Sequence, residues 1–527
     1  MPQASPSVLL INPPVTKPCE PPAGMAKLSA ALRGYGIAHR IIDANVGGLL
    51  CLLARPLPSG RGDDAWTARS VRNVEHNLSL LRDFSLYGHR DRYMRAVKDI
   101  GRVLARTSPP GIGVGIANYE QNDLSPLRSA DLLAAAERPE RNPFYPYFRS
   151  QIEEVFHDFT PTAAGISLNF LSQALPAFSL IGALRRACPG LTVIVGGGLV
   201  TSWLSNPRWT NPFRGLIDHL VAGPGEHRLA GLLGMATRPD EQWRPDYSSL
   251  LDNNYLSPGF VLPYSASTGC YWKKCRFCPE RSEANPYAPV PAGQVMEDLK
   301  KLAEKTSPVL IHFLDNAMSP ALLRALAAGG SGIPWYGFCR IDSGLVDPDF
   351  CMALRESGCV MLKLGIESGD QGVLDALGKG ITAETASRVL KNLKRAGIAT
   401  YVYLLFGTPA ESEEAARNTL AFTVRHCDSI DFLNLAIFNM PVCGDEAEEM
   451  ETRNFYEGDL SLYREFTHPL GWNRRRVRTF LDREFRRHPA IWPILQNDPP
   501  FFTSNHAPFF VMQRHCSSDV QHNPARG

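Results

Sequence analysis

The sequence lacks any apolar run that approaches the roughly 20 residues of a membrane-spanning helix. Its first residues, MPQASPSVLLINPP, show no basic region before a long apolar stretch, so we do not expect a secretory signal. Charge of one sign is not in excess, because 55 Lys and Arg face 53 Asp and Glu, for a net charge of +2. We therefore expect no membrane insertion and no binding to nucleic acid.

Internal repeats and long low-complexity segments are also missing. The twelve cysteines could suggest disulfides. A long chain without an export signal is more typical of a reducing compartment, so we expect a cytoplasmic protein with free thiols. With 44% apolar and 20% charged residues over 527 positions, the chain can bury several cores.

Three of the twelve cysteines, Cys270, Cys275 and Cys278, lie within nine residues in the segment GCYWKKCRFCPE. Clustered thiolates are soft ligands that suit zinc or iron–sulfur centres. Zinc usually takes a fourth protein ligand from a second paired motif, and no second Cys-x-x-Cys occurs in the chain. The triplet therefore predicts a 4Fe–4S cluster with one open iron. A structural zinc site and unreactive buried cysteines are the alternatives.

This segment resembles the cluster loop of the radical S-adenosylmethionine (SAM) enzymes, although its spacing is C-x4-C-x2-C rather than the usual C-x3-C-x2-C. The resemblance implies that the three cysteines hold the cluster and that SAM binds its fourth iron. It places Phe277 beside the adenine. It also implies an electron donor such as flavodoxin or ferredoxin, because SAM is cleaved reductively.

Residues 261–440 alternate apolar runs with helical patterns, which predicts a partial (β/α)6 barrel. The expected strands are Val261–Ser265, Val309–Leu314, Pro334–Arg340, Val360–Ile366, Thr400–Leu405 and Phe432–Phe438. Functional groups of such barrels lie at the carboxyl ends of the strands. The triplet follows the first of these strands, in agreement with that rule.

Further residues at these strand ends match positions that bind SAM in the family. They are Asp315, Asn316, Arg340, Glu367, Ser368, Gly407, Pro409 and Glu411. By the resemblance, the Asp–Asn pair meets the amino group of SAM, and the arginine pairs with its carboxylate. The Glu–Ser pair holds the ribose or the methionine end, and the G-x-P-x-E turn lies near adenine. Lys379 and Thr382 are interpreted as helix-start or surface residues.

The N-terminal part, residues 1–235, predicts a Rossmann-like domain. Strands at Ser7–Asn12, Ala38–Asp43, Ala163–Leu168 and Thr192–Val195 alternate with helices, and a mainly helical insertion spans about 51–160. The segments GISLNFLSQALPAF, VIVGGG and AGPGEHRL resemble the cobalamin-binding domain that precedes the barrel in one radical SAM subgroup. The first loop, NPPVTKPCEPPAG, lacks the histidine that ligates cobalt in some of these proteins. Cobalamin binding and a corrin-free domain are both left open.

Residues 236–260 are interpreted as a linker and residues 441–527 as an α-rich C-terminal extension. The aromatic segment Asp498–Phe510 is expected to pack across the mouth of the barrel. Cys339, Cys359, Cys427, Cys443 and Cys516 lie outside the triplet, and most are expected to be buried packing residues.

The resemblance favours a radical SAM enzyme that modifies a small-molecule or peptide-derived precursor, by cobalamin-type C-methylation. One alternative is transfer of a 3-amino-3-carboxypropyl group from SAM to a thiophilic acceptor such as trivalent arsenic, as in arsinothricin biosynthesis. The second is an iron–sulfur or cobalamin sensor without turnover. The identity of the substrate is not readable from the sequence.

Overall fold

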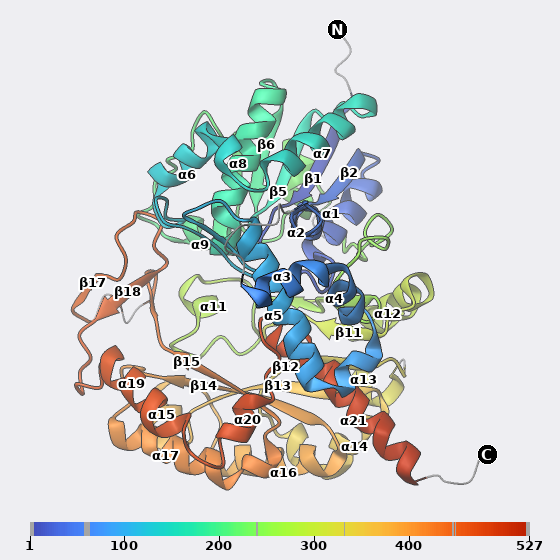
Figure 1. Ribbon diagram of the computed structural model, residues 1–527. Helices are drawn as coiled ribbons and strands as arrows, with labels where there is room; N and C mark the ends of the chain where they lie inside the picture. Colours follow the sequence, from blue (N-terminus) through green and yellow to red (C-terminus); the bar gives the residue numbers. More distant parts are fainter. Residues whose placement is uncertain are drawn as a thin grey trace. The chain divides into compact units, whose positions relative to one another are not determined.

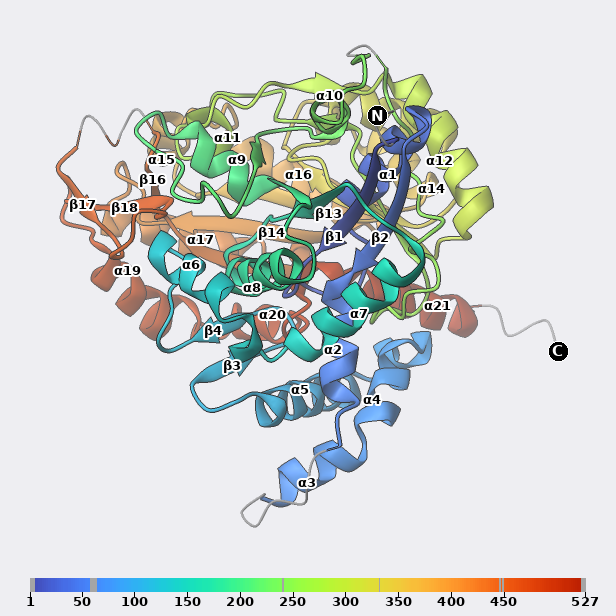
Figure 2. The same cartoon turned by 90° about the horizontal axis from the view of Figure 1, so that it is seen from above.

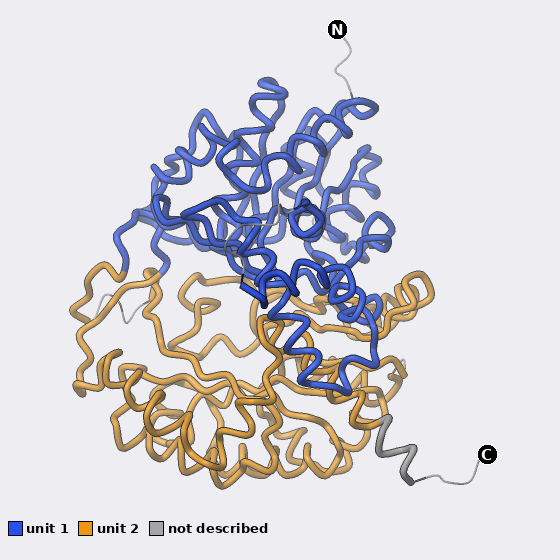
Figure 3. Tube along the Cα trace, in the orientation of Figure 1, with its two compact units in different colours: residues 1–260, 456–462 blue, residues 261–455, 463–527 orange. Residues whose placement is uncertain are grey.

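The computed structural model describes residues 5–56, 64–238, 241–330, 332–444, 447 and 450–522, with side chains up to residue 515. The chain divides into two compact units (Figure 3). Unit 1 comprises residues 1–260 together with 456–462, and unit 2 comprises residues 261–455 and 463–527. In the described part of the chain, no helix is long and apolar enough to cross a membrane.

Unit 1 is built on a five-stranded parallel sheet in the order β2-β1-β5-β6-β7. Its strands are β1 (Ser7–Asn12), β2 (Ala38–Asp43), β5 (Ala163–Ser167), β6 (Thr192–Gly196) and β7 (His219–Val221). The expected strands are confirmed to within one or two residues, because short apolar runs between turn residues mark buried parallel strands clearly.

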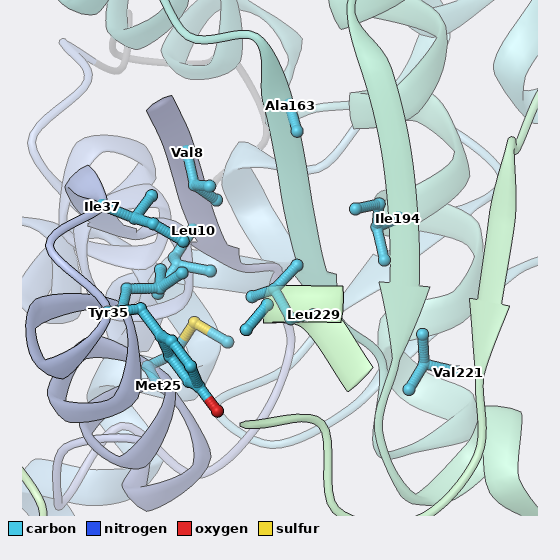
Figure 4. Packing of buried hydrophobic residues seen from close by; sticks show 11 residues of the cluster. Val8, Leu10, Met25, Tyr35, Ile37, Ala163, Ile194, Val221 and Leu229 are labelled. Carbon is cyan, nitrogen blue, oxygen red and sulfur yellow. The ribbon is translucent and has the colours of Figure 1, made fainter. Parts of the chain in front are cut away.

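Helices pack on this sheet. The helix α1 (Ala23–Gly34) and the short helix α10 (Glu226–Leu232) contribute to a core in which Met25 and Leu229 meet Val8 and Leu10 of β1 (Figure 4). Tyr35 closes this cluster at its edge. The longer helix α8 (Leu171–Ala187) is almost entirely buried along its first three turns. The apolar faces of α1 and α10 thus pack with the strands in one hydrophobic cluster.

The region of the expected insertion holds helices and one hairpin. The helices are α2 (Ala44–Leu53), α3 (Ala65–Arg72), α4 (Val74–Leu81), α5 (Arg90–Thr107), α6 (Ser129–Glu137) and α7 (Tyr145–Asp158). The glycine-rich stretch GIGVGIAN forms the first strand of the hairpin of β3 (Ile112–Val114) and β4 (Tyr119–Gln121). Figure 2 shows this hairpin beside α5. The helices α3 and α4 both pack against α5.

A seven-residue strap, residues 456–462, belongs to unit 1 although its neighbours in sequence belong to unit 2. The backbone N–H of Leu460 donates to the carbonyl of Leu127 at 3.0 Å. The carboxylate of Asp459 accepts the N–H of Ser129 at 2.9 Å and so caps the first turn of α6. Position 458 requires glycine, because a Cβ there would lie 2.1 Å from the Leu127 carbonyl oxygen.

Unit 2 contains six parallel strands in the order β15-β14-β13-β12-β11-β8. They are β8 (Val261–Tyr264), β11 (Leu310–Phe313), β12 (Trp335–Cys339), β13 (Cys359–Glu367), β14 (Ala399–Phe406) and β15 (Phe432–Ile437). Each lies where a barrel strand is expected. The fold class is confirmed, with an open six-stranded (β/α) sheet following a Rossmann-like sheet.

Helices follow these strands in turn and cover their outer face (Figure 1). They include α12 (Ala292–Thr306), α13 (Pro320–Gly329), α14 (Pro348–Glu356), α16 (Ala383–Ala396) and α17 (Glu413–Arg425). The interpretation of Thr382 is confirmed, because its hydroxyl accepts the N–H of Thr385 at 3.0 Å and caps α16. Gly397 ends the same helix at a φ of +71°.

The aromatic segment Asp498–Phe510 packs at the amino ends of the strands of unit 2. Its expected position, across the carboxyl-end mouth of the barrel, is therefore wrong. Asp498 accepts the hydroxyl of Tyr401 at 2.6 Å. The side-chain amide of Asn497 donates to the carbonyl of Asp431, the residue just before β15. His506 is fully buried and stacks on Phe502 at 3.8 Å between ring centroids. The aromatic composition of this segment predicts that it is buried. Its hydrogen bond with Tyr401, and that of Asn497 with Asp431, both far away in sequence, decide at which end of the sheet it packs.

Candidate functional site

The candidate site lies within unit 2, where the carboxyl ends of its strands carry the residues singled out in the sequence. The cysteine loop follows β8, and Asp315 and Asn316 follow β11. Arg340 follows β12 directly, and Glu367 is the last residue of β13. Parallel strands end at one edge of a sheet, which is the reason that these distant positions converge.

The cysteine loop docks on residues 377–380, the loop before α16. The indole N–H of Trp272 donates to the carbonyl of Gly378 at 3.0 Å, and the N–H of Arg276 donates to the carbonyl of Leu377 at 3.0 Å. Gly378 and Gly380 both have positive φ, of +64° and +66°. A Cβ on the second would lie 2.2 Å from the Trp272 ring. The glycines therefore permit the close approach of the two loops.

Two cations lie next to the central cysteine. Arg340 Nη1 lies 3.8 Å from the sulfur of Cys275, and its guanidinium carbon lies 4.0 Å from the centre of the Trp272 ring. The other guanidinium nitrogen donates to the carbonyl of Lys379 at 2.6 Å. Lys379 Nζ lies 5.6 Å from the centre of the Phe277 ring. Positive charge beside a thiol favours its ionised, metal-binding form.

Lys379 is buried and forms an ion pair with Glu367 at 2.8 Å, so its interpretation as a helix-start or surface residue is wrong. Glu367 is equally unusual, since it has a φ of +69° and follows a register shift between β13 and β14. Such a backbone costs roughly 1 kcal/mol or more for a residue with a Cβ. The bulge and the ion pair together hold the carboxylate at the strand end.

Burial raises the pKa of two of the three thiols. The pKa of Cys275 is raised by burial, while Lys379 and then Arg340 act in the opposite direction. Burial raises the pKa of Cys278 to about 11, and the charges of Cys275 and Cys270 add to this effect. Among the described residues, no three His, Cys, Asp or Glu side chains are gathered as ligands of a single metal ion.

Asp315 shapes the start of the cysteine loop. Its buried carboxylate accepts the N–H of Ala266 at 3.0 Å and the hydroxyl of Ser267 at 2.5 Å. Asn316 is exposed and lies within hydrogen-bonding distance of the carbonyl of Gly269, at 3.5 Å. The hydrogen bonds of Asp315 and Asn316 therefore go to the loop that carries the cysteines.

Ser368 is not brought to this group. It is fully buried, its hydroxyl lies 3.0 Å from that of Thr419 on α17, and it accepts the N–H of Asp370 at 3.1 Å. These bonds turn the hydroxyl of Ser368 toward α17, whereas the carboxylate of Glu367 pairs with Lys379.

The G-x-P-x-E turn after β14 is closed by its own carboxylate. Glu411 accepts the N–H of Gly407 at 2.5 Å and the indole N–H of Trp472 at 2.9 Å, and its second oxygen is buried without a partner. Burial raises the pKa of this carboxyl to about 7. Gly407 has a φ of +77°, and Pro409 lies half-buried in the turn. Phe277 packs against two apolar clusters, one that includes Val373 and Leu377 and one that includes Phe438 and Met440.

The remaining cysteines are a mixed group. Cys339 and Cys359 are buried, and burial holds the pKa of both thiols well above the ordinary value. Cys427 and Cys443 are partly exposed. The side chain of Cys516 lies outside the described residues. Cys339 and Cys359 are thus in keeping with the expected packing role.

The carboxyl edge of the sheet in unit 1 is rich in glycine. Gly197, at the start of α9 (Gly198–Ser205), has a φ of +109°, and a Cβ there would lie 2.5 Å from the carbonyl oxygen of Leu168. Gly223, which follows β7, has open space where a Cβ would lie. The loop after β1 carries no histidine. Backbone at this edge can approach a flat ligand closely.

Comparison with known proteins matches residues 264–423 to the radical SAM superfamily. The chain is 24% identical over 312 residues to an uncharacterized methyltransferase, PH0819, of Pyrococcus horikoshii, which covers 52% of this chain and 66% of that protein. An uncharacterized protein of Methanocaldococcus jannaschii, MJ1620, is 32% identical over 75 residues, which is 14% of this chain and 15% of that protein.

Two solved structures share the fold. One is TsrM, a radical SAM methyltransferase from Kitasatospora setae with tryptophan and a SAM analogue bound, at a TM-score of 0.56, 15% identity, and coverage of 93% of this chain and 89% of that one. The other is the cobalamin-dependent radical SAM enzyme OxsB with aqua-cobalamin bound. Its TM-score is 0.52 at 14% identity, and the match covers 81% of this chain and 53% of that one. The chain thus spans only about half the length of OxsB and just under two thirds of PH0819.

Proposed function

We propose that the protein is an enzyme that cleaves SAM reductively and transfers a methyl group to a small-molecule or peptide-derived substrate, and the match of residues 264–423 to the radical SAM superfamily supports this. The observation that carries this proposal is the set of cations and thiols at the carboxyl ends of β8, β12 and β13. Arg340 and Lys379 flank Cys275 there, and Glu367 lies beside them.

The donor set fits a 4Fe–4S cluster by its chemistry. Cys270, Cys275 and Cys278 would hold it, and the two neighbouring cations would offset the negative charge of the thiolates. When bound, the cluster supplies the electron that breaks a carbon–sulfur bond of SAM. The chain itself would position SAM, with Arg340 as a donor to its carboxylate and Phe277 against its adenine.

Cobalamin would lie at the glycine-rich edge of unit 1. The name of PH0819 and the cobalamin-bound OxsB structure support a cobalamin-type methyl transfer. Since the loop after β1 lacks histidine, cobalt would have no histidine ligand from this loop. The visible spectrum of the protein incubated with hydroxocobalamin tests whether the protein binds cobalamin. A spectrum identical to that of free hydroxocobalamin after gel filtration, or no retained corrin, contradicts it.

Product analysis tests the SAM chemistry. The protein is reconstituted anaerobically with iron and sulfide, for which we expect about four irons per chain, and is then incubated with SAM and dithionite. We expect 5′-deoxyadenosine from the wild type and none from Cys275→Ala, with Cys427→Ala as the matched control. Methylthioadenosine as the sole product would instead indicate aminocarboxypropyl transfer. Neither product from an iron-loaded wild type contradicts the proposal and favours a sensor.

A further inference from the structure

The segment that carries the cysteine triplet, residues 269–278, has charge of one sign and is called here the basic loop. It contains three cations, Lys273, Lys274 and Arg276, and no carboxylate. The whole chain has a net charge of only +2, so this excess of positive charge is local to the loop. A surface that gathers charge of one sign attracts partners of the opposite sign and speeds their association.

The three cations of the basic loop are exposed, and none of them forms an ion pair with a carboxylate of the described residues. Two half-buried carboxylates follow the loop. Burial raises the pKa of Glu280, and Lys273 acts on that carboxyl in the opposite direction. Glu283 accepts the side-chain amide of Asn285 at 3.2 Å. The positive charge of the loop is therefore turned to solvent.

The neighbouring helix offers little compensation. The cysteine loop docks on residues 377–380, which directly follow α15 (Gln371–Ala376). The one carboxylate of this helix, Asp375, accepts the side-chain amide of Gln371 at 2.8 Å. The ammonium of Lys274 instead lies 4.8 Å from the centre of the Trp272 ring. An aromatic ring leaves the net charge of a cation unchanged, so this contact orients the lysine and keeps its charge available.

The backbone at position 273 indicates that its lysine side chain has a use. Lys273 has a φ of +51°, in the left-handed region that glycine adopts at no steric cost. In the loop on which the basic loop docks, the two residues with positive φ are glycines, Gly378 and Gly380. A lysine is thus kept where glycine would relieve strain, and strain that persists in this way is typical of functional positions.

The basic loop also lies where an electron has to enter. Cys275 stands between Lys274 and Arg276 in the chain, and consecutive Cα atoms are about 3.8 Å apart. A protein that contacts both cations is therefore next to a residue proposed to hold the cluster. Reductive cleavage of SAM consumes an electron that reaches the cluster from outside, and electrons pass rapidly between proteins only over short distances.

We propose that Lys273, Lys274 and Arg276 form the docking surface for a small acidic electron-carrier protein of the flavodoxin type. The inference rests on the proposed function, since the carrier would supply the electron for SAM cleavage at the same site. One electron leaves the reduced flavin of the carrier and enters the cluster, so the carrier is oxidised by one electron. Opposite charges steer such brief encounters, and their small interfaces suit three cations on one loop.

A second basic surface provides a matched comparison. Arg478 in α19 (Arg474–Phe480) and Arg483 and Arg487 after it are exposed and form no ion pair within the described residues. Carboxylates alternate with these arginines, however, since Asp482 and Glu484 lie in the same segment. This surface carries no part of the triplet. Removing its three charges changes the net charge of the protein as much as removing those of the basic loop.

The test measures binding without turnover. Biolayer interferometry records the affinity of oxidised flavodoxin for the anaerobically reconstituted, cluster-loaded protein at low salt, without SAM or reductant. We expect saturable binding that weakens as salt is raised, and a loss of about tenfold in the triple variant Lys273→Gln/Lys274→Gln/Arg276→Gln. The control Arg478→Gln/Arg483→Gln/Arg487→Gln should keep the affinity of the wild type. No saturable binding to the wild type, or equal affinities of the two triple variants, overturns the inference.

A second measurement on the wild type covers the case in which the basic-loop variant fails to fold or to load iron. A carbodiimide joins lysine side chains to carboxylates that they contact. Cross-linking with flavodoxin, followed by peptide mapping, is expected to link Lys273 or Lys274, and high salt should suppress the link. Links confined to other lysines contradict the inference.

Failure of this inference differs from failure of the proposed function. Dithionite needs no docking surface, so the product analysis with dithionite reports on SAM cleavage alone. A wild type that cleaves SAM with dithionite, but whose affinity for flavodoxin does not depend on the basic loop, sinks only the docking surface. A wild type that forms neither SAM product with dithionite sinks the proposed function, whatever its affinity for flavodoxin.

Discussion

The ion pair of Glu367 and Lys379 is the residue-scale feature on which the candidate site depends. Replacing one partner of a buried pair leaves an uncompensated charge, so we expect Lys379→Met to lower the free energy of unfolding by about 3 to 5 kcal/mol. Urea unfolding of the metal-free protein measures this, with the exposed Lys394→Met as control. The double variant Glu367→Gln/Lys379→Met should recover part of the loss. A single variant as stable as the control would show that the pair has no structural role.

Glu411 gives the site a pH dependence of defined sign. Its pKa is raised from 4.5 to about 7 in the folded state, so its contribution to stability is full below the unfolded pKa and is lost as pH rises through 7. Relative to the wild type, Glu411→Gln should therefore gain about 2 kcal/mol between pH 5 and pH 8. Urea midpoints at both pH values measure the gain. A difference that is constant with pH would contradict the raised pKa.

The sequence identified some site residues and misread others for a physical reason. The cysteine triplet and Arg340 are recognisable in the sequence, because thiols and a guanidinium at successive strand ends are the groups that a cluster and SAM would need. Asp315 and Ser368 share that order, yet the carboxylate of Asp315 bonds to the start of the cysteine loop and the hydroxyl of Ser368 lies on Thr419, since a side chain's direction at a strand end depends on the local backbone. Lys379 has one signal in the sequence, the glycines on both sides of it in LGKG, which allow a loop to pack closely.

At the scale of elements, the strap of residues 456–462 supplies an N-terminal cap to a helix far away in sequence. Removing a capping carboxylate typically costs about 1 kcal/mol, so Asp459→Ala should lower the stability by that amount and expose the strap to protease. Glu457→Ala is the matched control, because the pair of Glu457 with Arg128 is largely exposed. Limited proteolysis with peptide mapping measures the effect. Equal cleavage of both variants would contradict a capping role.

Elements themselves follow from the sequence, and their long-range partners do not. The strands of both sheets lie where short apolar runs are bounded by turn residues, since burial on both faces requires such runs. The C-terminal aromatic segment is also recognisable as buried. Its place at the amino ends depends on bonds from Asn497 to Asp431 and from Tyr401 to Asp498, and no local pattern encodes these pairs.

At the scale of the whole molecule, a Rossmann-like unit precedes a unit in which residues 264–423 match the radical SAM superfamily. The order of fold classes was readable from strand–helix alternation. No sequence pattern predicts that residues 456–462 belong to unit 1, because the residues on both sides of them, Phe455 and Tyr463, belong to unit 2. The contact between Lys363 and His312 was not readable either, because it depends on the registers of β11, β12 and β13.

The central claim is that Cys270, Cys275 and Cys278 hold a cluster with one iron open to SAM. Low-temperature electron paramagnetic resonance of the reduced protein with 15N-labelled SAM tests it most directly. We predict a changed cluster signal on addition of SAM and a hyperfine coupling to its amino nitrogen, both absent from Cys275→Ala. A four-iron cluster whose signal is the same with and without SAM, and which shows no nitrogen coupling, would contradict the account.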